Sequence, residues 1–120
     1  MGRKQRRRER IAAPTADYAG PDGATLTLRG SMSPATRREY AAVLAGERAA
    51  PSAAREDVWH RAAEFLFERL AVRWTVAGLP IDRQQDLLAR YRMASGSERD
   101  WIRGVLRDHC AEHFPDLESP

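Results

Sequence analysis

The sequence predicts an all-α fold, a small four-helix domain around one long central helix, preceded by an extended strap and a disordered basic arm. Three observations predict it. Residues 55–77 place apolar side chains at spacings of three and four. Helix start and stop residues divide the remainder of residues 30–114 into three further helical segments. Strand-like alternation is confined to residues 24–29. The expected organisation is an arm with a linker, one helical domain and a short tail, over residues 1–23, 24–114 and 115–120.

The N-terminal arm carries nearly all the excess positive charge. Residues 1–10 hold six basic side chains and one acidic one, a formal charge of +5, whereas residues 11–120 hold fourteen basic and sixteen acidic ones. The arm has no large apolar residue between Met1 and Ile11, so we expect it to be disordered. A flexible cationic arm can lie along the phosphate backbone of DNA or RNA, and a basic tail without a partner is the equal alternative. The candidate nucleic-acid-binding residues are Arg3, Lys4, Arg6, Arg7, Arg8 and Arg10.

A linker and an extended segment follow the arm. Residues 12–23 are rich in Pro, Gly, Asp and Ala. In residues 24–29, Leu26 and Leu28 alternate with polar side chains. This segment either forms a strap that presses the two leucines onto the helices or pairs with residues 16–19, or with a second subunit, as a strand. We expect the strap, because an isolated hairpin is marginally stable.

The first helix has clear start and stop signals. Ser33 is a favourable N-cap, Pro34 suits the first helical position, and Gly46 suits the end. We therefore predict a helix between Ser33 and Gly46, with an inward face formed by Tyr40, Val43 and Leu44. Residues 46–54 are predicted to form a loop of small residues.

The central helix is predicted to run from Arg55 to Ala77 and to end at Gly78. Its apolar residues cover most of its circumference, so it must be enclosed by the other helices. Phe67 and Val72 are potentially left over on its outer side. The core residues expected from this helix are Trp59, Phe65, Leu66, Leu70 and Trp74.

Two more helices complete the predicted domain. One begins after Pro80 and spans residues 81–93. The other spans residues 98–113, with Ser97 and Asp100 in a pattern that resembles a capping box. With the first helix they are expected to add to the core Leu44, Leu88, Tyr91, Trp101, Ile102 and Leu106.

Three patterns in the sequence could form sites of chemistry. His109 and His113 share a helix face at the i, i+4 spacing that can bind zinc. A third ligand is missing, and Glu112 directly precedes the second His instead of following the first, as it does in HExxH. We expect both histidines to finish the core, with no metal and no cofactor. Cys110 lies near a predicted helix C-terminus, where the dipole raises a thiol pKa, so it is not expected to be a nucleophile. The sequence shows no other catalytic motif, and we expect neither catalytic residues nor an enzyme.

The third pattern is a helix-turn-helix formed by residues 55–77, 78–80 and 81–93. Two features count against it, namely the length of the first helix and the acidic Asp82 and Asp86 on the second. A separate arginine ridge at i, i+4 and i+8 is flanked by acidic residues, so we interpret it as solvated charge. The ridge consists of Arg99, Arg103 and Arg107.

These observations support two functional hypotheses. The first is a non-enzymatic accessory protein associated with DNA or RNA through the arm. The alternative is a protein–protein interaction adaptor, a subunit of a larger complex or a homo-oligomer, in which the arm is incidental and Phe67 and Val72 form an interface. An exposed Phe67 would favour the adaptor. Nucleic acid would be favoured if one face gathered Arg83, Arg90, Arg99, Arg103 and Arg107.

The sequence also bears on location. It contains no apolar run long enough to span a membrane and none behind the basic N-terminal residues that would make a secretory signal. Its single cysteine cannot form an internal disulfide. We therefore expect a cytoplasmic protein without a membrane partner.

Overall fold

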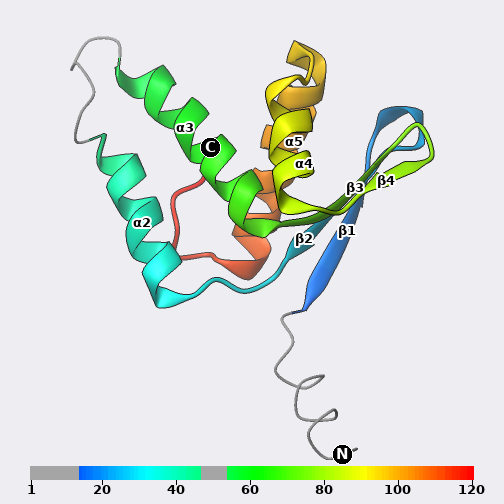
Figure 1. Ribbon diagram of the computed structural model, residues 1–120. Coiled ribbons are helices and arrows are strands. Elements are labelled where there is room, and N and C mark those ends of the chain that lie inside the picture. The colour runs from blue at the N-terminus through cyan, green and yellow to red at the C-terminus, as the bar shows by residue number, and fades with distance from the viewer. Residues whose placement is uncertain (1–13, 47–53) are drawn as a thin grey trace, which may run out of the picture.

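The computed structural model describes residues 14–46 and 54–120, and over these residues the fold is mixed α/β. Within them, four α-helices accompany a four-stranded antiparallel sheet with the strand order β1-β2-β3-β4 (Figure 1). The prediction of an all-α helical bundle is therefore wrong. The predicted disordered arm and most of the predicted loop over residues 46–54 lie outside the described residues.

The N-terminal segment forms a β-hairpin, where a strap was expected. β1 (Thr15–Ala19) and β2 (Thr25–Arg29) pair in antiparallel register, with a short turn, η1 (Pro21–Gly23), between them. β2 also pairs with β3 (Ala71–Val76). The argument from marginal stability failed because the hairpin does not stand alone. β3, more than forty residues later in the sequence, pairs with β2 and makes it an inner strand of the sheet.

The predicted central helix divides into a helix and a strand. α3 (Ala54–Leu70) ends at Leu70, and the chain continues directly into β3. Val72, Thr75 and Val76 in this stretch are β-branched and favour a strand once β2 supplies a partner. Phe67 is fully buried, contrary to the prediction that it is left over, because it packs against Trp74 of β3 with the ring centroids 5.8 Å apart.

The predicted turn between two helices is a second hairpin. β4 (Leu79–Ile81) pairs with β3 across Ala77 and Gly78, whose φ angles are 51° and 78°. Two successive positive φ angles are typical of the tight turns that join antiparallel strands. α4 (Gln84–Arg92) begins only after this hairpin, so residues 55–93 do not form a helix-turn-helix.

The two remaining helices were predicted from their caps. α2 (Pro34–Ala45) has Ser33 as N-cap and Gly46, with φ of 59°, at its end, which confirms the prediction. α5 (Gly96–His113) begins two residues earlier than predicted. Its capping box consists of Ser95 and Glu98, because Ser95 accepts from the Glu98 backbone and the Glu98 carboxylate accepts from the Ser95 backbone.

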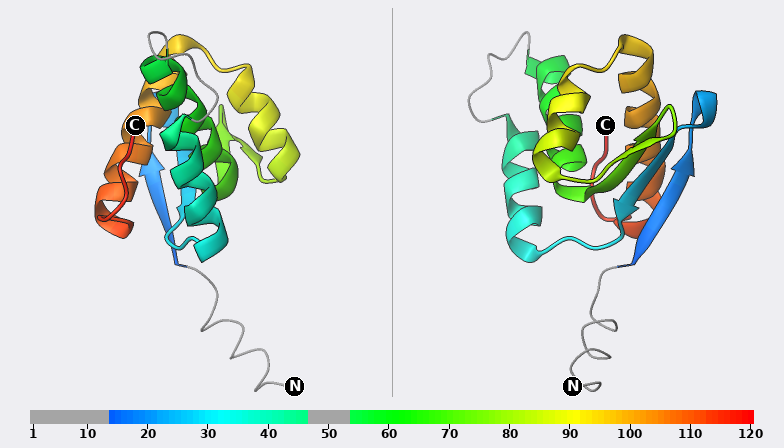
Figure 2. Two further views of the ribbon diagram at one scale, coloured as in Figure 1. Left: turned by 90° about the vertical axis from the view of Figure 1, so that its left-hand side faces the viewer. Right: turned by 45° about the vertical axis from the view of Figure 1, so that its right-hand side comes forward.

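The helices gather on one side of the sheet (Figures 1 and 2). The strand register places one row of side chains toward them, consisting of Tyr18, Leu26, Trp74 and Ile81. The predicted core residues Leu66, Leu70, Trp74, Tyr91, Ile102 and Leu106 are buried. Other predicted core residues are only half-buried, namely Leu44, Trp59, Phe65, Leu88 and Trp101.

Across residues 14–46 and 54–120, every helix is too short or too polar to cross a membrane.

Candidate functional site

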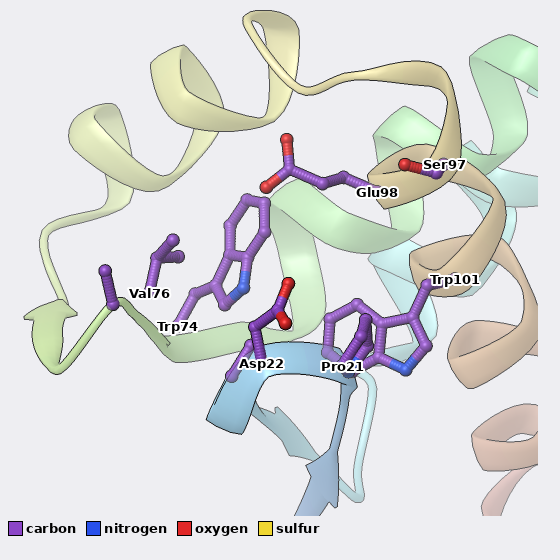
Figure 3. A pocket seen from close by; sticks show the side chains of 9 residues that line it. Pro21, Asp22, Trp74, Val76, Ser97, Glu98 and Trp101 are labelled. Carbon is purple, nitrogen blue, oxygen red and sulfur yellow. The ribbon is translucent and has the colours of Figure 1, made fainter.

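The two hairpin turns and the start of α5 enclose a cavity of about 290 Å³ (Figure 3). We call it the tryptophan pocket, because Trp74 of β3 and Trp101 of α5 form much of its wall. The chain builds it from three distant segments, so its residues come together only in the folded state. Its other lining residues are Pro21, Asp22, Ala24, Val76, Ala77, Ser97 and Glu98.

Trp74 contributes a buried hydrogen-bond donor without a partner. The residue is 1% exposed, and its Nε1 has no hydrogen-bond partner among the described residues. Figure 3 shows the indole nitrogen on the ring edge that turns toward Asp22 and Trp101. A buried unpaired N–H destabilises a fold by about 1–3 kcal/mol. The pocket wall therefore offers a donor that an acceptor atom of a ligand can satisfy.

The two carboxylates of the pocket differ in their partners. Glu98 accepts from Arg90 at 2.6 Å and from the Ser95 backbone at 2.9 Å. The hydrogen bond from the Ser95 backbone and the one from Arg90 both lower the pKa of Glu98. Asp22 is exposed, adopts φ of 58°, and forms no ion pair with another described residue. The charge that remains uncompensated in the pocket is thus that of Asp22.

A second, more open hollow runs along β1, which is an edge strand of the sheet. We call it the acidic groove. It has a volume of about 440 Å³ and meets the tryptophan pocket at Trp101, which lines both. Asp100 and Asp108 form no ion pair with another described residue, whereas the Asp17 carboxylate accepts from the Thr27 hydroxyl at 2.6 Å, in the row of side chains on the other face of the sheet. Its lining residues are Asp17, Tyr18, Ala19, Asp100, Trp101, Gly104, Val105 and Asp108.

Gly20 holds Trp101 at the junction of the two hollows. A Cβ atom on Gly20 would lie 2.4 Å from Cζ2 of Trp101, closer than such atoms approach. Since the φ of Gly20 is −120°, its backbone would accept other residues, and the indole alone requires glycine here. The position of Trp101 thus depends on the absence of a side chain at Gly20, which directly follows β1.

α5 separates its charges onto two faces. The predicted arginine ridge turns toward the rest of the chain, where Arg99 donates to the Arg92 carbonyl, Arg103 to Glu56 and Arg107 to the Pro120 carbonyl. The adjacent face, with the same spacing of four, lines the acidic groove and consists of Asp100, Gly104 and Asp108. The sequence shows Asp100 and Asp108 beside the arginine ridge, but it does not show that they line a groove of their own.

His109 lies at the centre of a buried hydrogen-bond chain. Its Nε2 donates to the Arg29 carbonyl at 2.6 Å, because a carbonyl oxygen only accepts. Its Nδ1 therefore accepts from the Tyr18 hydroxyl, also at 2.6 Å. Burial lowers the pKa of His109, and the nearby His113 lowers it further. Both ring nitrogens are occupied, so His109 serves the fold and is not free to bind a metal.

The remaining sequence candidates are placed as follows. Cys110 is fully buried, and burial raises its thiol pKa to about 11, which argues against a nucleophile. Among the described residues, no cluster of three His, Cys, Asp or Glu side chains suits a metal ion. Arg90 is paired with Glu98 and stacks on Trp74, with its guanidinium 4.8 Å from the ring centroid. The six candidate nucleic-acid-binding residues of the arm lie outside the described residues.

No protein-family model, curated protein or solved structure matches this chain. The function is therefore inferred from the chemistry of the two hollows. They combine uncompensated carboxylates, an indole face and a buried donor beside the edge of a sheet, which suits an extended cationic ligand.

Proposed function

We propose that the chain is a non-enzymatic, cytoplasmic adaptor whose folded part binds an extended, positively charged segment of a partner protein. The observation that carries this proposal is the meeting of the tryptophan pocket and the acidic groove at Trp101 beside an edge strand. The predicted interface at Phe67 cannot serve, because that side chain is buried. The two hollows provide a different surface for the same adaptor function.

Each group in the hollows meets a group of a basic peptide. Lysine or arginine side chains pair with the carboxylates of the groove, and a guanidinium can stack on the indole of Trp101. A peptide carbonyl can accept from the Trp74 N–H, which a side-chain cation alone cannot do. The outer edge of β1 offers backbone groups to an added strand.

The folded part already contains the kind of contact proposed. Within the described residues, four arginine guanidinium groups lie 4.7–5.6 Å from the centroid of an aromatic ring. Three of these stacks join separate segments of this same chain, and the fourth, Arg69 on Phe65, lies within α3. Trp101 has a comparable ring at the surface, and its position between two acidic hollows favours an arginine of another segment.

Fluorescence anisotropy with a labelled eight-residue peptide of alternating Arg and Ser tests this proposal. We expect full-length protein to bind it with an affinity that falls as salt rises, and to ignore a Glu-Ser counterpart. Exposed ion pairs contribute about 0.2–1 kcal/mol each, so losing three carboxylates should weaken binding roughly tenfold. This variant of the two hollows carries Asp22→Asn, Asp100→Asn and Asp108→Asn.

A matched control removes three exposed carboxylates elsewhere, with Asp57→Asn, Asp82→Asn and Asp86→Asn. We expect the control to bind almost as the wild type does. Equal weakening in both variants would mean that the peptide senses net charge alone. Binding of the Glu-Ser peptide with equal affinity would contradict the proposed chemistry.

A second candidate function is association with DNA or RNA through the arm. It is favoured by the +5 charge of residues 1–10, while Arg90, Arg92 and Arg103 of the folded part are paired with its own acids. Wild-type protein should bind a single-stranded oligonucleotide with an affinity that falls as salt rises. Replacing the arm arginines with Gln in the full-length chain should abolish this binding. Affinity that survives the replacement would place any nucleic-acid site in the folded part.

A further inference from the structure

We propose that the arm of the same chain, residues 1–10, occupies the acidic groove and the tryptophan pocket when no partner is bound. The inference rests on the proposed function, since it names an occupant for the same surface. It makes the arm a built-in competitor of the partner segment.

Charge complementarity is the first argument. The arm carries six basic side chains, and the two hollows present three aspartates without an ion pair to another described residue. Arg90 neutralises Glu98 in the pocket, and the arginines of α5 are turned to other partners. The carboxylates of the hollows left uncompensated are those of Asp22, Asp100 and Asp108.

The point at which the chain enters the sheet is the second argument. Pro14 accepts a hydrogen bond from the Gly30 backbone at 2.6 Å, and a Cβ on Gly30 would lie 3.0 Å from Nδ1 of His113. The start of β1 is therefore next to the C-terminal part of α5, where Asp108 lies. A segment that turns back before Pro14 would meet the groove at Asp108 and run antiparallel to β1.

The length of the arm is the third argument. Ten extended residues span roughly 33 Å, whereas the five residues of β1 span roughly 17 Å. Residues 11–13 remain for the reversal of direction. The arm is therefore long enough to pass along the groove and reach Asp22 at the far end of the hairpin.

The buried donor and the edge strand favour a peptide occupant over free ions. The Trp74 N–H needs an acceptor, which sodium or potassium cannot supply and a peptide carbonyl can. Gly104 faces the groove in the middle of a helix, and a Cβ there would meet no atom within 4 Å, so a backbone has room to approach. Covering β1 also protects an edge that would otherwise pair with other chains.

A tethered arm has an effective concentration of about millimolar, so modest affinity suffices for occupancy. The consequence is a coupling between two ligands. A polyanion that draws the arm away opens the groove to a partner, and a partner in the groove releases the arm. Each must strengthen the binding of the other by the same factor.

The test measures binding of the Arg-Ser peptide to the full-length wild type and to a full-length arm variant. The arm variant replaces five arginines with Gln, at Arg3, Arg6, Arg7, Arg8 and Arg10. Because the competing arm is lost, we expect the peptide to bind the variant about tenfold more tightly at low salt, with the gain vanishing at high salt. A matched control replaces five exposed arginines elsewhere, at Arg38, Arg55, Arg61, Arg73 and Arg83.

The outcomes separate the two proposals. A gain in the arm variant that the control does not share supports the inference. Equal peptide affinity in wild type and arm variant would overturn it while leaving the adaptor function intact. No peptide binding in any variant would overturn the adaptor function itself.

Two readouts locate the arm. In the NMR spectrum, the indole N–H signals of Trp74 and Trp101 should shift between wild type and arm variant, whereas the signal of Trp59 on α3, which lines neither hollow, should not.

The wild type should also stay monomeric on sedimentation as its concentration rises. A dimer that the arm variant fails to form would overturn occupancy by the same chain in favour of the arm of a second copy.

Discussion

Replacing Gly20 with Ala is predicted to displace Trp101 and to damage the fold and the binding surface together. The added Cβ would lie 2.4, 2.6 and 2.9 Å from three atoms of the indole, so the ring must move. Forcing extra volume into a packed site costs about 1–3 kcal/mol. The backbone contributes nothing to this cost, because φ of −120° suits alanine.

The assay for this prediction combines urea unfolding with Arg-Ser peptide binding. A loss of about 1–3 kcal/mol should lower the urea midpoint of unfolding, and peptide affinity should fall because the two hollows lose their common wall. Gly104→Ala on α5 is the matched control for the unfolding measurement. A Cβ there meets nothing within 4 Å, so it should raise stability by about 0.5–1 kcal/mol through helix propensity.

The result that would refute this reasoning is a Gly20→Ala variant with unchanged stability and an unchanged indole N–H signal for Trp101. Such a result would mean that the ring does not rest on Gly20. A Gly104→Ala variant that loses stability would instead show that the groove face of α5 is already occupied by the folded chain.

Further predictions concern the core and its titrating groups. Because burial lowers the pKa of His109, its contribution to stability is present above the unfolded pKa of about 6.5 and is lost as pH falls through the folded value. Urea unfolding from pH 7.5 to pH 5 should show this loss, and His109→Gln should reduce the slope. Leu66→Ala should destabilise by about 2–5 kcal/mol in the same assay, because Leu66 is fully buried. Trp74→Phe removes an unpaired buried N–H, so its stability should fall by less than that of Trp74→Leu, while calorimetry should detect weaker peptide binding. Cys110 should react with a thiol reagent only in urea, since it is fully buried; rapid labelling of native protein would contradict its placement.

Local signals predicted the elements that depend on local chemistry. Ser33, Pro34 and Gly46 predicted α2, because capping groups act within one turn of the helix they cap. Residues 71–76 were predicted as helix and form a strand, because the spacing of their apolar residues fits both. Pairing with β2, a contact between distant parts of the sequence, favours the strand.

The site was less predictable than the fold, for a related reason. Asp22, Trp74 and Trp101 lie far apart in the sequence, and only the two hairpins and α5 bring them together. The sequence does contain two ridges on α5, one basic and one acidic. It does not say which of them faces the rest of the chain, because that depends on partners in α3 and in the C-terminal tail, Glu56 and Pro120.

The hydrogen-bond chain through His109 has a consequence for how the protein is made. Tyr18 lies 91 positions before His109 in the sequence, and Arg29 lies 80 positions before it. A ribosome synthesises the first hairpin long before the helix that supplies its buried partner. Because such long-range contacts form late, the hairpin should stay unprotected on the nascent chain until α5 has emerged. Ribosome-bound chains ending before residue 96 should therefore be cut rapidly by a protease in β1 and β2, and chains that expose all of α5 should resist.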